Sequence, residues 1–163
     1  MYETVVEPAD FRAAMSQFAS GVTVVTTKDA AGVPVGFTAS AFSSLSLDPP
    51  LVLVCLDKRA ECYEVFAGAD AMGISILAVG QIAIALRFAS RGADKFGPGG
   101  LIDGDVRQMP LVAGATVQME CAIVERLPGG DHTILIGKVL RAKTFDAQPM
   151  VHYNRVFGRF SAE

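Results

Sequence analysis

Short runs of β-branched and apolar residues, separated by turn-forming residues, recur along the chain and limit the folds open to it. Residues 22–28 read VTVVTTK, and residues 51–56 read LVLVCL. β-Branched side chains fit the pleated surface of a strand better than the surface of a helix. The two runs therefore predict strands. Turn residues at 29–32 predict that residues 33–39 return as the hairpin partner of the first strand.

Three more strands are predicted in the second half of the chain, over residues 71–78, 117–123 and 132–140. The last two are joined by the turn sequence PGGD. In 117–123, apolar residues alternate with Gln118 and Glu120. This period of two indicates a strand with one buried face and one solvent-facing face.

Helical spacing of apolar residues predicts three short helices, over residues 10–18, 61–67 and 81–89. Asp10 is expected to cap the first of them. Residues 90–114 are rich in Gly, Pro, Asp and Arg and are expected to form a long irregular connection. Many strands with three short helices as lids favour a mainly β fold, an antiparallel barrel in one domain over residues 1–163. A Gly-rich dinucleotide fingerprint and a P-loop are both missing from the sequence.

The composition excludes two classes of protein. Apolar residues make up 51% of the 163 residues and charged residues 19%, against about 25% charged residues in ordinary domains. Such a chain is too apolar for intrinsic disorder, and the apolar surplus suggests a buried subunit interface. The net charge of −3 gives no electrostatic reason to expect nucleic-acid binding.

The cysteines and the apolar runs point to a cytoplasmic protein outside the membrane. Cys55, Cys62 and Cys121 lack the spacing of a disulfide framework or a zinc site, and we expect buried free thiols and no metal. The longest apolar run, sixteen residues over 71–86, contains glycines and is shorter than the roughly 20 residues of a membrane span. The N-terminus lacks the pattern of a signal peptide.

The segment GFTASAFSSLSLDPP, residues 36–50, carries five hydroxyl side chains between Thr38 and Ser46. Small hydroxyls and exposed backbone N–H groups suit phosphate and polyol ligands. Phe37 and Phe42 are placed to flank a planar ring. On residue types alone, a Ser-rich surface loop is the more common explanation.

Four segments in a fixed order resemble one family. They are FRAAMSQFASGVTVVTT (11–27), GFTASAFSSLSLDPPLVLV (36–54), GGDHTILIG (129–137) and VHYNRVFGRF (151–160). Together they resemble the short-chain flavin reductases, which are reductase components of two-component flavin-dependent monooxygenases. The resemblance covers residues 8–160 and implies a homodimer of six-stranded FMN-binding split β-barrels, with the flavin near the subunit interface.

The resemblance also implies which residues contact the flavin. One group lines the ring, ribityl chain and phosphate: Thr38, Ala39, Ser40, Ser43, Leu45 and Ser46. A second group contacts the flavin tail: Cys55, Leu56, Asp57, Lys58 and Ala60. The family often has Asn-Ser in place of Ser40-Ala41, and often a hydroxyl near Ala60, which here offers only its N–H. Lys58 and Arg59 supply positive charge to a phosphate or form a solvated strand end.

The segment RFASRGADKF resembles a family segment that lies close to the flavin or the nicotinamide. The resemblance therefore implies that it forms the other edge of the site. Its residues are Phe88, Ala89, Ser90, Arg91, Lys95 and Phe96. Arg87 and Arg91 are four residues apart. They are expected either to bind phosphate groups together or to compensate the helix dipole.

His132 is the implied catalytic residue, since the histidine of the family's Gly-Asp-His motif contacts the nicotinamide. Asp131 fixes the tautomer of this ring or shapes the turn. His152 and Tyr153 close the site from the partner chain or pack the tail.

The function implied is that of an NAD(P)H:flavin oxidoreductase. It moves a hydride from NADH to FMN or FAD and supplies free reduced flavin to a separate monooxygenase. Two alternatives stay open: a flavin-binding carrier or sensor without turnover, and another split-barrel flavoenzyme similar to pyridoxamine phosphate oxidase. The residues do not distinguish FMN from FAD, or NADH from NADPH.

Overall fold

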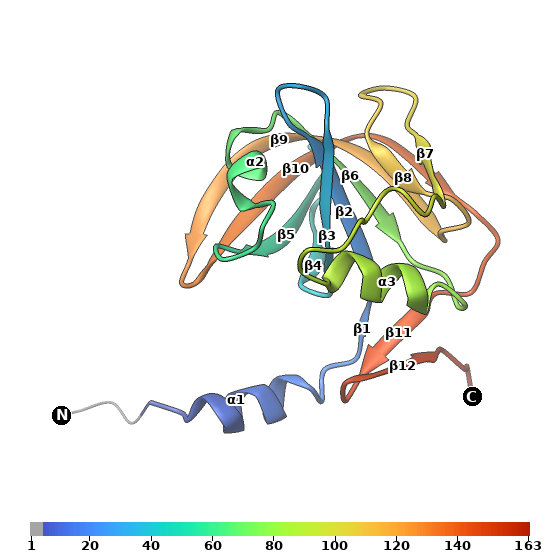
Figure 1. Ribbon diagram of the computed structural model, residues 1–163. Helices are drawn as coiled ribbons and strands as arrows, with labels where there is room; N and C mark the ends of the chain where they lie inside the picture. Colours follow the sequence, from blue (N-terminus) through green and yellow to red (C-terminus); the bar gives the residue numbers. More distant parts are fainter. Residues whose placement is uncertain (1–4) are drawn as a thin grey trace.

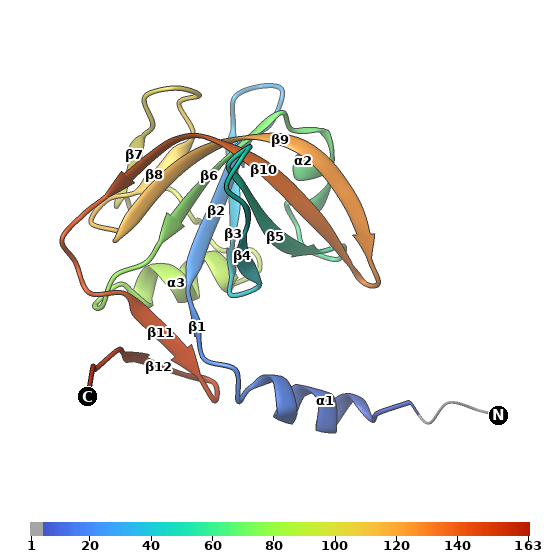
Figure 2. The same ribbon diagram turned by 180° about the vertical axis from the view of Figure 1, so that it is seen from behind.

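The frame of the protein is one antiparallel sheet of seven strands, seen from two sides in Figures 1 and 2. The computed structural model describes residues 5–163. In order across the sheet, the strands are β3 (Pro34–Ala39), β2 (Thr23–Lys28), β6 (Ala71–Ile76), β9 (Val117–Gly129), β10 (His132–Thr144), β5 (Leu51–Asp57) and β4 (Phe42–Ser46). The predicted strands are all present, and β2 pairs with β3 as the predicted hairpin. The sheet has one strand more than expected, because the Ser-rich segment pairs with β5.

The sheet curves into a barrel that is split between its two edge strands (Figure 1). The edges β3 and β4 follow one another in the chain, with only Ser40 and Ala41 between them, yet they do not pair with each other. The Cys55 N–H donates to the Ala41 carbonyl at 3.0 Å. The crossing from one edge to the other is therefore fixed against the end of β5.

Strand β2 is buried on both of its faces, and every position before its last residue, Lys28, is a valine or a threonine. Val25 packs inside the barrel with Ile74 and Leu135. Its neighbour Val24 points to the opposite face and packs with Phe88 and Ala85 of helix α3 (Ile82–Ala89). Alternate residues of a strand face opposite ways, so β2, with the barrel interior on one side and α3 on the other, has buried β-branched residues on both faces.

Helix α2 (Tyr63–Gly68) and α3 lie close to the predicted ranges, whereas α1 (Pro8–Met15) is shifted. Asp10 lies in the first turn of α1 and does not cap it. Pro8 begins the helix instead, because a proline at the first position has a helical φ and lacks only an N–H that would have no partner there. No helix of residues 5–163 is long and apolar enough to cross a membrane.

The segment 90–114 is not wholly irregular, which corrects the prediction. It contains a small hairpin of β7 (Leu101–Asp103) and β8 (Pro110–Val112). This segment also buries Gln118 and Glu120, which the alternation had placed in solvent. The Gln118 amide donates to the Val112 carbonyl at 2.7 Å, and the Glu120 carboxylate accepts the N–H groups of 106 and 107. These partners stabilise the two polar side chains without water.

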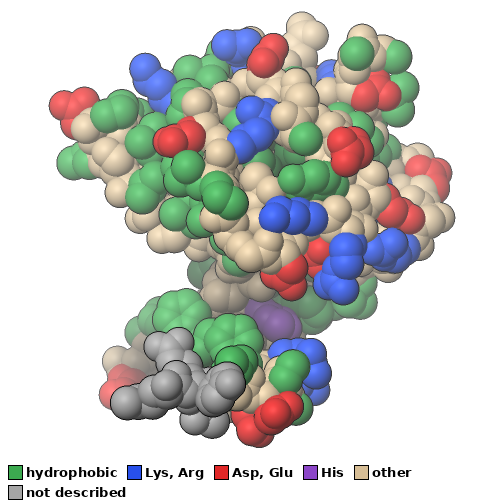
Figure 3. Space-filling view, turned by 90° about the vertical axis from the view of Figure 1, so that its left-hand side faces the viewer, with side chains coloured by type: hydrophobic (Ala, Val, Ile, Leu, Met, Phe, Trp, Pro, Cys, Tyr) green, Lys and Arg blue, Asp and Glu red, His purple; other side chains and the backbone are tan. Residues whose placement is uncertain are grey.

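A second, smaller sheet lies beside the barrel and joins the two ends of the described chain. It consists of β1 (Ser20–Gly21), β11 (Met150–Tyr153) and β12 (Val156–Arg159). Helix α1 extends from this sheet away from the barrel (Figures 1 and 2) and buries none of its residues. Apolar side chains gather on this projecting part below the barrel (Figure 3).

Candidate functional site

A cleft of about 350 Å³ opens at the split of the barrel. This volume lies within the usual range of small-molecule sites, roughly 300–1,000 Å³. The ends of β3 and β5, the loop before α2 and the end of α3 come together here, with the first residue of β10. The lining residues are Phe37, Thr38, Ala39, Ser40, Ala41, Cys55, Leu56, Asp57, Ala60, Glu61, Cys62, Phe88, Ala89, Ser90, Arg91, Lys95 and His132.

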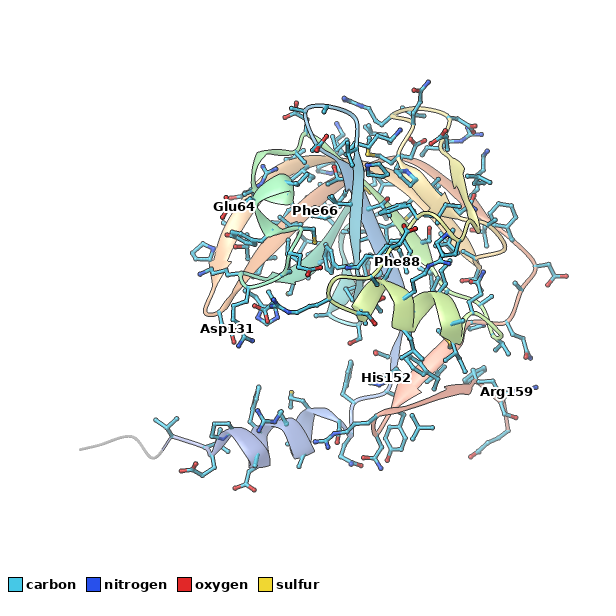
Figure 4. All side chains as sticks on the ribbon, viewed as in Figure 1. Glu64, Phe66, Phe88, Asp131, His152 and Arg159 are labelled. Carbon is cyan, nitrogen blue, oxygen red and sulfur yellow. The ribbon has the colours of Figure 1, made fainter. Side chains whose placement is uncertain are left out.

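Two aromatic rings and several small side chains form the walls of the cleft. Phe37 packs edge-on against Phe66, with ring centroids 5.2 Å apart, and Phe88 packs in the same way against Phe96. Figure 4 shows Phe66 and Phe88 in the interior, on either side of β3. The other lining positions include four alanines, at 39, 41, 60 and 89. Because these side chains are small, a planar ring can lie close to the backbone N–H groups of the wall.

The hydroxyls at the rim of the split have different roles. Thr38 Oγ1 donates to the Ala85 carbonyl at 2.6 Å and so ties β3 to α3. Its proton is therefore used inside the protein. Ser40 is exposed and lines the same cleft, so its hydroxyl is the one available to a ligand here.

Three cations at or near the cleft are bound only to backbone carbonyls. Arg91 donates to the Arg59 carbonyl at 2.6 Å, Lys95 to the Gly36 carbonyl at 3.1 Å, and Lys58 to the Gly130 carbonyl at 2.7 Å. None of the ion pairs found among residues 5–163 includes them. Their charges are thus uncompensated and suit a phosphate group.

The Arg59 guanidinium, by contrast, is held by Asp57. The two side chains form a two-point contact, at 3.1 and 2.8 Å. Together with the Arg59 N–H, this contact holds the pKa of Asp57 well below its usual value. The positive charge of Arg59 is therefore compensated by Asp57, and Arg59 is the weaker candidate for binding a ligand phosphate.

A pair of contacts closes the far side of the cleft. The Gly92 N–H donates to the Glu61 carboxylate at 2.9 and 3.1 Å, next to the bond between Arg91 and the Arg59 carbonyl. We call these contacts the 61–92 clasp. The clasp joins the segment after α3 to the loop before α2, across the cleft.

His132 begins β10 at the mouth of the cleft. Its Nδ1 lies 2.7 Å from Oδ1 of Asp131, and this contact lowers the pKa of the Asp131 carboxyl. In the sheet register His132 lies opposite Asp57. The histidine is therefore positioned by two strands, at the end where the uncompensated cations gather.

Known proteins share this architecture and sequence. The model of the flavin reductase like domain matches residues 15–161. The chain belongs to this family. It is 40% identical to the NADH:riboflavin 5'-phosphate oxidoreductase of Streptomyces pristinaespiralis, over 93% of this chain and 88% of that protein. It is 38% identical to the reductase component of a Rhodococcus opacus 4-nitrophenol monooxygenase, over 98% and 86%.

A solved flavin reductase has the same fold. The NADH:FAD oxidoreductase of Streptomyces globisporus C-1027, in complex with NAD and FAD fragments, superposes with a TM-score of 0.89. Its sequence is 36% identical, and the match covers 98% of each chain. The split-barrel fold and the family membership predicted from the four segments are thus confirmed.

The structure brings most of the predicted site residues of this flavin reductase to one cleft. They are Thr38, Ala39, Ser40, Cys55, Leu56, Asp57, Ala60, Phe88, Ala89, Arg91, Lys95 and His132. Arg87 is not among them, since it donates to the Gly99 carbonyl. It therefore does not act together with Arg91.

Six predicted residues lie outside the cleft of this chain. Lys58 follows β5 beside the cleft and donates to the β9–β10 turn, and Phe96 packs behind Phe88. Ser43, Leu45 and Ser46 lie on β4. Tyr153 lies on β11 and donates to Gln17 at 2.9 Å. His152 is on the same small sheet (Figure 4), and neither residue lines the cleft of its own chain.

Sequence reasoning did not propose Ala41, Glu61 or Cys62 as lining residues. Ala41 has a small apolar side chain and Cys62 a weakly polar thiol, and in a sequence both look like core residues. The glutamate had one available signal, since it is an acidic residue two positions before the start of α2.

Proposed function

We propose that residues 1–163 form a single domain that acts as an NADH-dependent flavin reductase. It takes up FMN or FAD and NADH and releases reduced flavin to a separate monooxygenase. The observation that carries this proposal is the cleft at the split of the barrel, which is lined by small side chains. His132 and three uncompensated cations converge on it. The activities of the similar oxidoreductases and reductase component support it.

The residues of the cleft fit a flavin. The alanine-lined wall admits a planar ring, while Ser40 and backbone groups offer hydrogen bonds along it. Arg91 and Lys95 supply charge for the phosphate, and the aromatic side chains of Phe37 and Phe88 exclude water from beneath the ring. A bound flavin supplies the hydride acceptor in this reaction.

The residues of the chain contribute orientation and not covalent chemistry. Hydride transfer requires the two reacting atoms to be held about 3–3.5 Å apart and correctly aligned. His132 is at the mouth of the cleft and is the residue placed to hold the nicotinamide. No proton leaves a carbon in hydride transfer, so the imidazole has no need to act as a base.

The proposal includes a homodimer. Phe11 and Met15 on α1 and the nearby Phe18 are exposed by 53%, 54% and 79%, which is costly for aromatic and aliphatic groups in water. A second copy of the chain covers them in the proposed assembly. The same pairing accounts for the position of Tyr153 outside its own cleft.

The test is an NADH oxidation assay with purified protein and either FMN or FAD, followed at the nicotinamide absorbance. The proposal predicts NADH consumption well above the rate without protein. Flavin binding without NADH consumption would indicate a carrier or sensor. Oxidation of pyridoxamine phosphate in place of NADH would indicate the other kind of split-barrel enzyme.

A His132→Ala variant tests the assignment of this residue. The variant loses a contact to the nicotinamide and keeps the flavin-lining walls, so the Kd of NADH rises more than the Kd of the flavin. One lost hydrogen bond corresponds to about a three- to tenfold change. Equal affinities of variant and wild type for both ligands would remove His132 from the site.

A further inference from the structure

The turn that carries His132 is held more firmly than an ordinary hairpin turn. Asp131 is at the tip of the β9–β10 hairpin (Figure 4), next to Gly130, whose φ of 69° is in the left-handed region. The Lys58 N–H donates to the Asp131 carbonyl at 3.0 Å, and its ammonium group to the Gly130 carbonyl at 2.7 Å. Lys58 thus anchors both residues before His132 to the end of β5.

This anchored turn directs the Asp131 carboxylate at one nitrogen of the imidazole. Oδ1 of Asp131 lies 2.7 Å from Nδ1 of His132. An ionised carboxylate accepts hydrogen bonds and donates none, so the proton of the neutral ring belongs on Nδ1. The remaining nitrogen, Nε2, then carries a lone pair.

The second carboxylate near the ring does not compete for it. Asp57 lies opposite His132 in the strand register, but both of its oxygens accept from Arg59. The ammonium group of Lys58 is bound to a carbonyl. Asp131 is therefore the one carboxylate within residues 5–163 that hydrogen-bonds to the His132 ring, and no hydrogen bond in this part of the chain involves Nε2.

We propose that Asp131 is a positioning residue that makes His132 a hydrogen-bond acceptor in the cleft, and that this acceptor recognises the amide NH₂ of the nicotinamide carboxamide. The inference rests on the proposed flavin reductase function. A histidine with the opposite tautomer presents a donor and favours the carboxamide oxygen. The tautomer therefore decides which end of the carboxamide faces His132, and so which way the nicotinamide ring is turned.

The first measurement is the tautomer itself. The chain has two histidines, so two-bond ¹H–¹⁵N spectra of histidine-labelled protein are simple, and a His132→Gln variant assigns them. At a pH where the ring is neutral, we expect a protonated Nδ1 and an unprotonated Nε2. In Asp131→Asn the amide keeps the size of the side chain but also donates, so this preference is lost. A protonated Nε2 in the wild-type protein would overturn the proposal.

The second measurement is discrimination between reduced nucleotides. The reduced 3-acetylpyridine analogue of NADH has a methyl group in place of the amide NH₂ and keeps the oxygen. In Asp131→Asn we expect the preference for NADH over this analogue, as a ratio of kcat/KM values, to fall about three- to tenfold. The change is expected in KM for NADH. A purely structural role lowers both kcat/KM values together and leaves the ratio unchanged, which would contradict the proposal.

The matched control is Asp29→Asn, which removes the same charge from another hairpin turn. Asp29 accepts the N–H groups of 31 and 33 and lies outside the cleft, so the ratio is expected to stay at its wild-type value. Failure of the wild-type protein to oxidise NADH would overturn the proposed function and with it the nicotinamide contact. The spectra would still decide the Asp131–His132 tautomer, so the two failures are distinguishable.

Discussion

The two cysteines of the cleft and the third in the barrel core differ in their surroundings, and thus in reactivity. Cys55 is half-buried at the cleft, and desolvation raises the pKa of its thiol. Cys121 is fully buried, and burial raises the pKa of its thiol to about 12. The thiolate is the reactive form, so a raised pKa means slow reaction at neutral pH.

We therefore predict that iodoacetamide labels Cys55 slowly at neutral pH and faster as the pH rises above the ordinary thiol value, while Cys121 stays unlabelled in the folded protein. Peptide mass spectrometry gives the labelled fraction at each site. Bound FMN is expected to protect Cys55, because this residue lines the proposed flavin cleft. Rapid labelling at neutral pH, or labelling unaffected by FMN, would contradict this placement.

At the scale of single residues, residue type predicted burial correctly for apolar side chains and less well for polar ones. The alternation in 117–123 placed Gln118 and Glu120 in solvent, yet both are buried. Their partners come from residues 106–112, and a local pattern contains no information about a loop that folds over the strand. Thr38 shows the same limit. Its hydroxyl looked available for a ligand, but its acceptor is on a helix 47 residues away.

At the scale of elements, the 61–92 clasp is expected to keep the wall of the cleft in place. The segment between α3 and β7 is mostly exposed, so polar contacts supply much of what holds it near the cleft. Loss of the Glu61 carboxylate leaves the Gly92 N–H without its partner and frees the segment that carries Arg91 and Lys95.

We predict that Glu61→Ala weakens flavin binding about three- to tenfold and speeds amide hydrogen exchange over residues 90–97. Flavin fluorescence titration and exchange mass spectrometry measure the two effects. Glu64→Ala is the control, since this exposed residue of α2 is outside the cleft lining. Unchanged flavin affinity in Glu61→Ala would show that the cleft does not depend on the clasp.

Elements with strong local signals were predictable, and elements formed by distant partners were not. β2 has β-branched residues on both faces because the barrel interior and α3 bury them, and β5 is apolar up to Asp57, so both strands leave a clear signal in the sequence. β7 and β8 are three residues each, too short for any periodicity. The Ser-rich residues of β4 have little strand propensity, and they form a strand because β5 offers them an edge.

At the scale of the whole molecule, the apolar surplus has a visible location. α1 and the small sheet project from the barrel (Figure 1). The apolar side chains on β12 and directly after it include Val156 and Phe160, exposed by 65% and 63%. A single chain leaves this surface in water. Obligate interfaces between subunits are more apolar than ordinary surface, so the projecting part has the composition of an interface.

We predict that the wild-type protein sediments as a dimer and that the double variant Phe11→Asp, Met15→Asp sediments as a monomer. Two carboxylates buried in an apolar interface without partners cost far more than exposed ones, whereas in the monomer they lie in water on a helix that buries nothing. Circular dichroism is therefore expected to show an intact barrel. Ile102→Asp is the control, because this exposed residue lies on β7, away from α1 in both ribbon views. A dimeric double variant would exclude α1 from the interface, and a monomeric wild-type protein would contradict the proposed assembly.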